Sequence, residues 1–123
     1  METGGLGKVY QDGEVIVRQG EMGNCMYVIQ SGKAEVVEEI GGQTVSLAVL
    51  GEGDFFGEMA IFEDEVRSAT VRAFGAVRVL TVDKKILLRQ IQQDPALAFH
   101  ILEYMCRRVR KLDCELALVK TGT

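Results

Sequence analysis

The chain has few of the residues that metal centres and disulfide-bonded proteins require. Its 123 residues include one histidine, His100, and three cysteines. A single imidazole excludes a histidine-rich metal centre, and we expect His100 on the surface of a helix. Cys25, Cys106 and Cys114 are odd in number and widely spaced, so they predict neither a disulfide framework nor a Cys-x-x-Cys metal site. Cys106 and Cys114 are expected to fill space on one helix.

Long apolar runs and an excess of positive charge are also absent. Strictly apolar stretches such as 47–50 are short, far below the roughly 20 residues of a membrane span. The N-terminus carries no secretory signal pattern. With 14 basic and 18 acidic residues and a net charge of -4, the chain lacks the positive field of a nucleic-acid binder. We therefore expect a cytoplasmic protein with no direct contact to membrane or nucleic acid.

No catalytic constellation is visible. The sequence shows no Ser-His-Asp, Cys-His or paired-carboxylate set, and no glycine loop followed by Lys-Ser or Lys-Thr. We expect a protein that is not an enzyme and that needs neither a metal nor a cofactor. Its length and its 47% hydrophobic and 26% charged residues predict one soluble globular domain spanning 1–123.

Short strands separated by glycines dominate the chain up to about residue 82. Alternating or β-branched segments predict strands at 14–18, 26–30, 33–39, 44–50, 69–73 and 76–81. Such close spacing favours an antiparallel sandwich or barrel. In the fourth segment Val45, Leu47 and Val49 are predicted to share one face, as a half-buried strand requires. Gly41 and Gly42 predict a hairpin turn before it.

Two helices are predicted after the strands. The first runs over 84–93 with Asp83 as its N-cap, and the second over 95–119 with Asp94 as N-cap and Pro95 in the first helical position. The apolar face of the first helix is expected to pack on the sheet through Ile86, Leu87 and Ile91.

Apolar residues in the last helix alternate at spacings of four and three. This seam consists of Ala98, Leu102, Met105, Val109, Leu112, Leu116 and Val119. The spacing is typical of a coiled coil, and opposite charges at the flanking positions suit a parallel homodimer, with the pairs Arg108–Asp113 and Glu115–Lys120. The alternative is that the stripe packs on the chain's own sheet.

The segment around Gly57 carries the chemistry of an anion site. A short helical piece at about 57–62 leaves its first N–H groups without partners in the helix, and Gly57 has no Cβ to keep a ligand away. Arg67 can offer a bidentate fork to phosphate oxygens. Glu58 would repel a phosphate, but its carboxylate suits a ribose hydroxyl. Together these residues suggest a small nucleotide with one negative charge.

The same residues also allow interpretations that involve no ligand. Arg67 can instead neutralise the acidic loop at 63–65, since a surface ion pair is the commoner role of an arginine. Glu58 can be a solvated carboxylate at a helix start. The apolar residues nearby, Phe55, Phe56, Tyr27 and Ile61, are expected in the core, with one ring or aliphatic edge lining the pocket.

Three segments resemble a known family. The run 56–61, Phe-Gly-Glu-Met-Ala-Ile, followed by Arg67-Ser68-Ala69, is similar to the phosphate-binding cassette of the cyclic nucleotide-binding domain. That family includes the bacterial catabolite activators, cyclic-nucleotide-dependent kinases and gated channels. Residues 14–21 and 26–33 are similar to the family's first strands, so the resemblance covers roughly residues 10 to 115.

The resemblance implies an eight-stranded, jelly-roll-like antiparallel β-roll over about 10–82, a short cassette helix and two C-terminal helices, the last one long. It implies that Glu58 binds the ribose 2'-hydroxyl and Arg67 the cyclic phosphate, while the amides of 57–60 and Ser68 complete the cradle. The implied ligand-binding residues are Phe56, Gly57, Glu58, Met59, Ala60, Arg67, Ser68, Ala69, Arg108, Leu112 and Asp113. Leu112 departs from the pattern, because catabolite-activator-like proteins have a hydroxyl side chain there.

The expected function is that of a regulatory module that binds a 3',5'-cyclic nucleotide, cAMP ahead of cGMP, and signals through movement of its last helix. It would form a homodimer through that helix, by Leu102, Met105, Val109, Leu112 and Leu116, with its output domain on another segment or chain. Two alternatives stay open. One is a degenerate β-roll that binds nothing and serves as an interaction scaffold, and the other is the effector domain of a transcription regulator that senses another small molecule.

Overall fold

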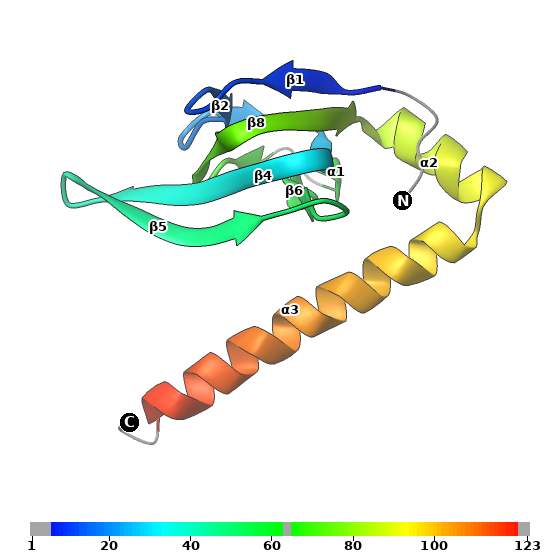
Figure 1. Ribbon diagram of the computed structural model, residues 1–123. Coiled ribbons are helices and arrows are strands. Elements are labelled where there is room, and N and C mark those ends of the chain that lie inside the picture. The colour runs from blue at the N-terminus through cyan, green and yellow to red at the C-terminus, as the bar shows by residue number, and fades with distance from the viewer. Residues whose placement is uncertain (1–5, 63–64, 121–123) are drawn as a thin grey trace. The chain divides into compact units, whose positions relative to one another are not determined.

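The predicted strands form one unit, and the C-terminal helices continue into a second (Figure 1). The computed structural model describes the backbone of residues 6–62 and 65–120 and the side chains of residues 6–61, 66–107 and 110. The two units are Met1–Leu87 and Leu88–Thr123.

The described part of the first unit consists mainly of β-strands. These are β1 (Lys8–Tyr10), β2 (Val15–Val17), β3 (Met22–Gly23), β4 (Met26–Ile40), β5 (Gln43–Leu50), β6 (Phe55–Phe56), β7 (Glu65–Val66) and β8 (Thr70–Val82), with the four-residue helix α1 (Met59–Phe62) before β7. Helix α2 (Lys84–Gln93) links the units, and α3 (Ala96–Lys120) lies in the second.

The main sheet is antiparallel and centred on the two longest strands. Strand β4 pairs with β8 on one side and β5 on the other, and β1 continues the order beside β8, as Figure 1 shows. Strand β2 also pairs with β8 and β6 with β4, while β3 and β7 form a separate two-stranded sheet. The mainly antiparallel β fold with C-terminal helices agrees with the prediction from sequence.

Two pairs of predicted strands are continuous in the structure. Segments 26–30 and 33–39 are both part of β4, and β8 contains 76–81 and all of 69–73 except Ala69. Glycines mark the predicted breaks, because Gly32 and Gly75 have φ of 84° and 75°. The β4–β8 register shifts around Ser31, so the glycines produce irregularities within a ladder that continues past them.

The core lies between β4, β8 and the short strands packed on them. Met26, Ile29, Val77, Val79 and Val82 are almost completely buried. Ile29 and Val79 are directly paired across the two strands. Fully burying one such side chain contributes about 1.5–3 kcal/mol, so the buried residues along β4 and β8 stabilise the first unit.

Strand β5 differs from its prediction. Its hairpin turn is as expected, with Gly41 and Gly42 at positive φ, but every residue from Gln43 to Val49 is exposed. A β-bulge shifts the register so that Val49 opposes Glu35 and Val45 opposes Glu38. Glu35 and Glu38 are an odd number of residues apart, so they lie on opposite faces of β4. Their partners Val49 and Val45 therefore lie on opposite faces too, and the predicted shared face is wrong.

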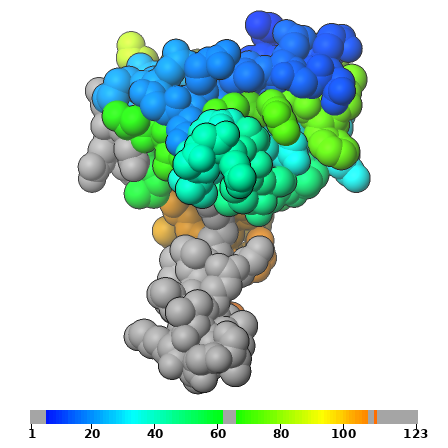
Figure 2. Space-filling model, turned by 90° about the vertical axis from the view of Figure 1, so that its left-hand side faces the viewer, coloured from blue at the N-terminus to red at the C-terminus, as the bar shows by residue number. Residues whose placement is uncertain are grey.

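Strand β5 lies at the edge of the main sheet. Among the strands that the structure describes, it pairs with β4 alone. The hairpin between the two strands, coloured cyan to green, projects towards the viewer in Figure 2. Since the side chains of β5 are exposed from Gln43 to Val49, no second layer covers them within the described part of the first unit.

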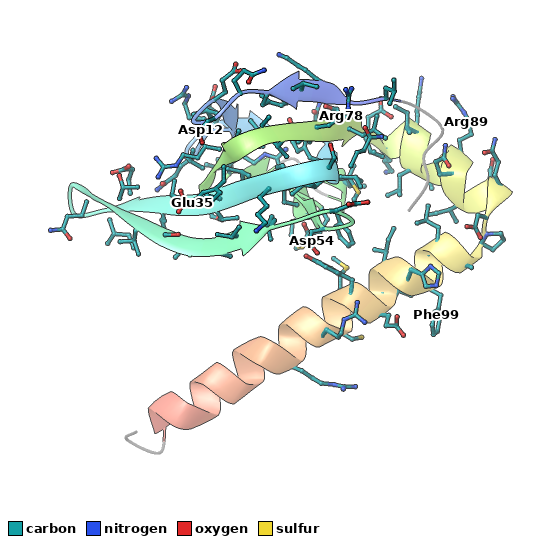
Figure 3. The ribbon with its side chains drawn as sticks, viewed as in Figure 1. Asp12, Glu35, Asp54, Arg78, Arg89 and Phe99 are labelled. Carbon is teal, nitrogen blue, oxygen red and sulfur yellow. The ribbon has the colours of Figure 1, made fainter. Side chains whose placement is uncertain are left out.

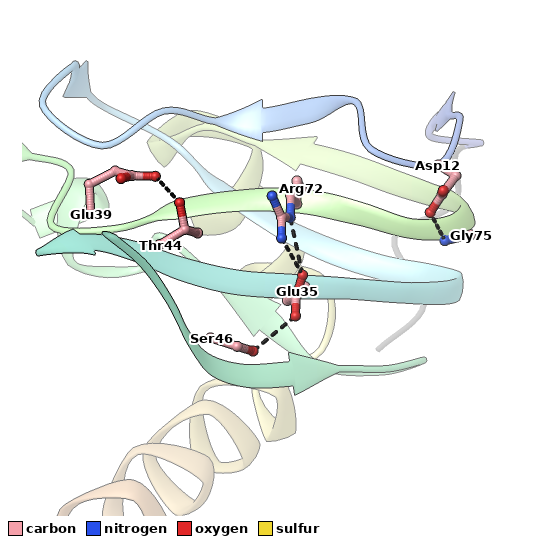
Figure 4. A network of polar contacts seen from close by, with 7 residues as sticks. All are labelled: Asp12, Glu35, Glu39, Thr44, Ser46, Arg72 and Gly75. Carbon is pink, nitrogen blue, oxygen red and sulfur yellow. Dashed lines mark hydrogen bonds and ion pairs between the residues drawn. The ribbon is translucent and has the colours of Figure 1, made fainter. Parts of the chain in front are cut away.

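One face of this hairpin carries a polar network (Figure 4). Arg72 donates to Glu35 Oε1 from Nε at 3.1 Å and from Nη2 at 2.9 Å, and the Ser46 hydroxyl donates to Glu35 Oε2 at 2.9 Å. Thr44 donates to Glu39 further along the hairpin. The bonds to Glu35 lower the pKa of its carboxyl, chiefly through Arg72 and then Ser46.

The predicted caps of α2 and α3 are confirmed. Asp83 Oδ1 accepts the Ile86 N–H at 2.8 Å, and Asp94 Oδ1 accepts the Ala96 N–H at 3.2 Å. These bonds satisfy amides that have no partner inside their helix. In α2, Leu87 is buried, whereas Ile86 and Ile91, expected with it on the sheet, are half-buried.

In α3, Leu97 and Ile101 are buried, whereas Leu102 of the predicted seam is 61% exposed. His100 is exposed as predicted, but Cys106 is exposed instead of filling space. The side chains of Cys114 and of Val109, Leu112, Leu116 and Val119 lie outside the described residues. Among the helices that the structure describes, none is long and apolar enough to cross a membrane.

Candidate functional site

Arg67 lies in the connection between β7 and β8. Its backbone is fixed from both directions, because its N–H donates to Glu21 O at 2.8 Å and its carbonyl accepts the Gly20 N–H at 2.9 Å. These bonds extend the pairing of β3 with β7. The arginine is thus held to a turn that lies far from it in sequence.

The segment around Gly57 follows a tight turn. Asp54 Oδ2 accepts the Gly51 N–H at 2.8 Å, and Asp54 O accepts the Ile29 N–H at 2.9 Å, which ties the turn to β4. Figure 3 labels Asp54 in this region. Gly57 itself has φ of 76°, a conformation that other residues adopt only at a cost.

The cassette helix begins later than predicted. Helix α1 starts at Met59, two residues after the predicted start, and the Ala60 N–H donates to Gly57 O at 3.2 Å. One of the four amides predicted for a phosphate cradle is therefore already bonded within the turn. Gly57 stands before the helix, with its carbonyl directed at both this amide and Arg67.

The Arg67 guanidinium donates to two main-chain carbonyls. Nη1 bonds Gly57 O at 3.1 Å, and Nη2 bonds Cys25 O at 2.7 Å. Neither acceptor carries a net charge, and none of the ion pairs between described side chains includes Arg67. The acidic side chains of 63–65, the alternative partners considered above, lie outside the described residues.

Two glycines leave room for this guanidinium. A Cβ on Gly23 would overlap the Nε, Cζ and Nη2 atoms of Arg67, and a Cβ on Gly57 would lie 2.5 Å from its Nη1. Real Cβ atoms do not approach other heavy atoms so closely. The arginine therefore occupies a slot that exists only because both positions lack a side chain.

One aromatic ring lies beside Arg67, and a second ring stacks on the first. The Tyr27 ring has its centroid 5.8 Å from the Arg67 Cζ and stacks with Phe56 at 5.1 Å and 17°. Phe56 is buried and Tyr27 half-buried, and Phe55 and Ile61 are buried as predicted. Burial raises the pKa of Tyr27 to about 12, with a smaller contribution from its hydrogen bond to the Cys25 thiol.

Glu58 directly follows Gly57 in the chain, and its side chain is buried. Only 7% of Glu58 is exposed, and it is the only buried charged residue among those that the structure describes. Its side chain is not left without partners. An inward glutamate next to Gly57 excludes the interpretation of Glu58 as a solvated carboxylate at a helix start.

The other predicted site residues differ in exposure. Ala60 is buried, Ala69 half-buried, and Met59 and Ser68 are exposed. Arg108, Leu112 and Asp113 belong to α3 in the second unit, and their side chains lie outside the described residues. The structure thus brings Gly57 and Arg67 together in one slot, with Phe56 stacked on the Tyr27 ring beside it and Glu58 following Gly57 in the chain.

Sequence analysis missed two contributors to the slot, Gly23 and Cys25, and included Tyr27 only among four residues of which one was expected to line the pocket. Gly23 provides space, Cys25 provides a carbonyl acceptor, and Tyr27 provides a ring under the cation. Cys25 acts through its backbone, which its residue type does not reveal. The alternation along β4 offered one signal, because Tyr27 lies between Met26 and Val28, which are both buried on the other face.

The arrangement is suited to binding an anion. A guanidinium has five N–H donors, and two of them donate to acceptors within the described part of the chain. The guanidinium charge has no carboxylate partner within that part of the chain, so an anionic ligand can supply the negative charge. The described residues contain no group of three or more His, Cys, Asp or Glu that could hold a metal ion.

Comparison with known proteins identifies the family. Residues 7–94 match the family described as "Cyclic nucleotide-binding domain". The chain is 34% identical over 113 residues to the cyclic AMP receptor protein of Thermus thermophilus, covering 91% of the chain and 52% of that protein. It is 44% identical over 79 residues to the cGMP-dependent protein kinase egl-4 of Caenorhabditis elegans, covering 62% of the chain and 10% of that protein.

A solved structure agrees with both matches. The crystal structure of the Thermus thermophilus catabolite activator protein superposes with a TM-score of 0.82 at 33% identity, covering 92% of the chain and 54% of that structure. The chain thus spans about half the length of the first of these relatives and a tenth of the second. Because the family match includes most of the described first unit, this chain belongs to the cyclic nucleotide-binding domain family.

Proposed function

We propose that this chain binds a 3',5'-cyclic nucleotide as a non-catalytic regulatory module. The observation that carries the proposal is the position of Arg67, whose guanidinium lies against the Gly57 carbonyl with only neutral acceptors among the described residues. A cyclic phosphate bears one negative charge and can accept the remaining N–H groups. Arg67 would bind the phosphate, Glu58 the ribose 2'-hydroxyl, and Ser68 and main-chain amides after Phe56 would complete the cradle.

We further propose a preference for cAMP over cGMP. The relative that is aligned over 91% of the chain is named a cyclic AMP receptor protein, and the relative that is aligned over 62% is named a cGMP-dependent protein kinase. Base contacts are assigned by resemblance to Arg108, Leu112 and Asp113. A signal would leave the domain by movement of α3. A ligand that binds more tightly when α3 is in one of two positions shifts the population of molecules towards that position.

A homodimer formed by α3 belongs to the same proposal. Leu102 is 61% exposed and Met105 half-buried in the described part of the predicted seam. A large exposed apolar side chain on a helix gains about 1.5–3 kcal/mol when a partner buries it. Output would come from a further segment or chain, and the expected location is the cytoplasm.

Calorimetric titration of the full chain tests the proposed function. The panel should contain cAMP, cGMP and 5'-AMP, because the last shares the base and sugar of cAMP but lacks the cyclic phosphodiester. We expect saturable binding of cAMP, weaker binding of cGMP and much weaker binding of 5'-AMP. Absence of heat and of thermal stabilisation with both cyclic nucleotides would leave the scaffold alternative.

Helix movement needs its own measurement. Spin labels at position 110 and on β5 would report the distance between the helix and the first unit with and without cAMP. A distance distribution that is unchanged at saturating cAMP would contradict signalling through α3 while leaving nucleotide binding intact.

A further inference from the structure

Arg67 and Tyr27 form a cation–aromatic contact inside the slot. The Arg67 Cζ lies 5.8 Å from the Tyr27 ring centroid, within the distance at which the negative face of an aromatic ring attracts a guanidinium. Tyr27 in turn stacks on Phe56, which opposes it between β4 and β6. The ring is therefore fixed by a neighbouring strand, and its face is a rigid support for the cation.

The remaining contacts of Arg67 restrict the guanidinium further. Cys25 O and Gly57 O accept from Nη2 and Nη1 at 2.7 Å and 3.1 Å. The Cys25 thiol also donates to the Tyr27 hydroxyl at 3.5 Å. Cys25 thus holds the arginine by its carbonyl and Tyr27 by its ring, while a thiol–hydroxyl hydrogen bond joins the two side chains.

A ring and a carboxylate would support this arginine with different consequences. A carboxylate would occupy two N–H donors and neutralise the charge, whereas a ring face attracts the cation without accepting any in-plane N–H bond. Tyr27 therefore orders Arg67 and leaves its charge and its remaining donors for a ligand.

We propose that Tyr27 is a positioning residue for Arg67, holding the guanidinium by its ring in the orientation that binds the anionic group of the ligand. The inference rests on the proposed function, because the anion is taken to be the cyclic phosphate. Tyr27 acts through Arg67, so it needs no contact with the ligand. The ring carries the effect, and the hydroxyl does not.

Three variants of the full chain separate these contributions. Tyr27→Phe keeps the ring and should bind cAMP within about twofold of the unaltered chain. Tyr27→Leu loses the ring and should bind roughly three- to thirty-fold more weakly. Tyr10→Leu is the matched control, because Tyr10 is also half-buried under a cation, but the cation is Lys8 at 4.9 Å. Its affinity should be unchanged.

Tyr27→Met serves if the leucine variant does not fold, because methionine is flexible and fills irregular space. Full affinity in a folded ringless variant would overturn the proposal. So would a loss in Tyr27→Phe equal to the loss in Tyr27→Leu, because the hydroxyl would then be the group that matters.

A nuclear magnetic resonance measurement on the free protein keeps this inference separate from the proposed function. Arg67 side-chain protons, assigned with Arg67→Lys, should be shifted upfield by the ring current, unlike those of Arg78, which donates to Gly7 O at 2.9 Å. The shift should persist in Tyr27→Phe and vanish in Tyr27→Leu. An unshifted Arg67 signal overturns the positioning contact, whereas a shifted signal without cyclic-nucleotide binding contradicts the proposed function alone.

Discussion

Arg67 donates from Nη1 to the carbonyl oxygen of Gly57 at 3.1 Å, although ten residues separate them in the chain. The same oxygen accepts the Ala60 N–H at 3.2 Å. One carbonyl thus connects the arginine to the first turn of α1. Movement of the guanidinium on ligand binding would free an acceptor at the start of this helix, which couples the arginine to the conformation of residues 57–60.

Removal of the Arg67 side chain should weaken cyclic-nucleotide binding. We expect Arg67→Ala to reduce cAMP affinity by about 2–5 kcal/mol, because the phosphate charge would enter the site without its charged partner. Calorimetry measures the change directly. The matched control is Arg78→Ala, because Arg78 of β8 (Figure 3) also donates from a partly buried position to a main-chain carbonyl, that of Gly7.

Arg78→Ala should lower the free energy of unfolding by loosening β1 without altering cAMP affinity. Equal affinity losses in both arginine variants would show that binding responds to general destabilisation, and an unchanged affinity in Arg67→Ala would remove Arg67 from the site.

A methyl group at position 23 should disturb the site without disturbing the fold. Gly23 is outside the left-handed region, so alanine fits its backbone, but the new Cβ would overlap the Arg67 guanidinium. The flexible end of the arginine must move away. We expect Gly23→Ala to change the free energy of unfolding by less than about 1 kcal/mol and to weaken cAMP binding severalfold, as measured by denaturation and calorimetry.

Gly41→Ala is the complementary control. Gly41 has φ of 58° with no atom within 4 Å of an added Cβ, so alanine there adds backbone strain of about 1–2 kcal/mol and no collision. It should lower stability and leave affinity unchanged. If Gly23→Ala binds normally while Gly41→Ala does not, the slot has no bearing on binding.

Local signals in the sequence were sufficient for much of the fold. Adjacent glycines at 41 and 42 gave the hairpin, and Asp83 and Asp94 gave the helix starts, because each acts on backbone groups within a few residues. The predicted shared face of β5 was wrong, because a β-bulge depends on the strand with which the segment pairs. Periodicity within one segment contains no information about its partner's register.

The site shows the same division. Gly57, Glu58 and Arg67 were found from their residue types and spacing, and the structure places Glu58 inward and Arg67 against Gly57. The slot itself was not found, because Arg67 meets Cys25 O across 42 residues of sequence. A backbone carbonyl is present at every position, so no residue type marks the one that serves as an acceptor.

Tyr27 should titrate apart from an ordinary tyrosine. The chain has three tyrosines and no tryptophan, so the absorbance of tyrosinate can be followed cleanly, and one group should ionise near pH 12. Tyr27→Phe should remove that step. Since the folded pKa is raised above the usual value of about 10, the related stability is present below pH 10 and is lost as pH rises through 12.

A Tyr27→Phe titration that retains the late step would assign it to another tyrosine. Tyr10→Phe is the control, and it should leave the step near pH 12 in place. Denaturation of both variants between pH 9 and 11 should show the smaller loss of stability in Tyr27→Phe.

Dimer formation should depend on Leu102. Replacement of this leucine by glutamine removes about 1.5–3 kcal/mol of apolar burial per chain, so the dissociation constant should rise at least tenfold in sedimentation equilibrium. Phe99→Gln is the matched control, since Phe99 (Figure 3) is 64% exposed on the same helix but lies outside the seam spacing. A monomeric unaltered chain, or a greater effect of Phe99→Gln, would contradict the seam.

The stability of the hairpin should depend on pH through Glu35. Hydrogen bonds from Arg72 and then Ser46 lower the pKa of this carboxyl in the folded state. The related stability is therefore present above the unfolded value of about 4.3 and is lost as pH falls through the folded value. Glu35→Gln should be less stable than the unaltered chain at pH 7, and the difference should close on acidification, as urea denaturation at pH 7, 5 and 3 would show.

Glu38→Gln is the control, because Glu38 lies on the same strand and outside the ion pairs of the described residues. Its loss of stability at pH 7 should be smaller than that of Glu35→Gln. A loss of stability in Glu35→Gln that persists at pH 3 would mean that the shape of the side chain, not its charge, supports the network.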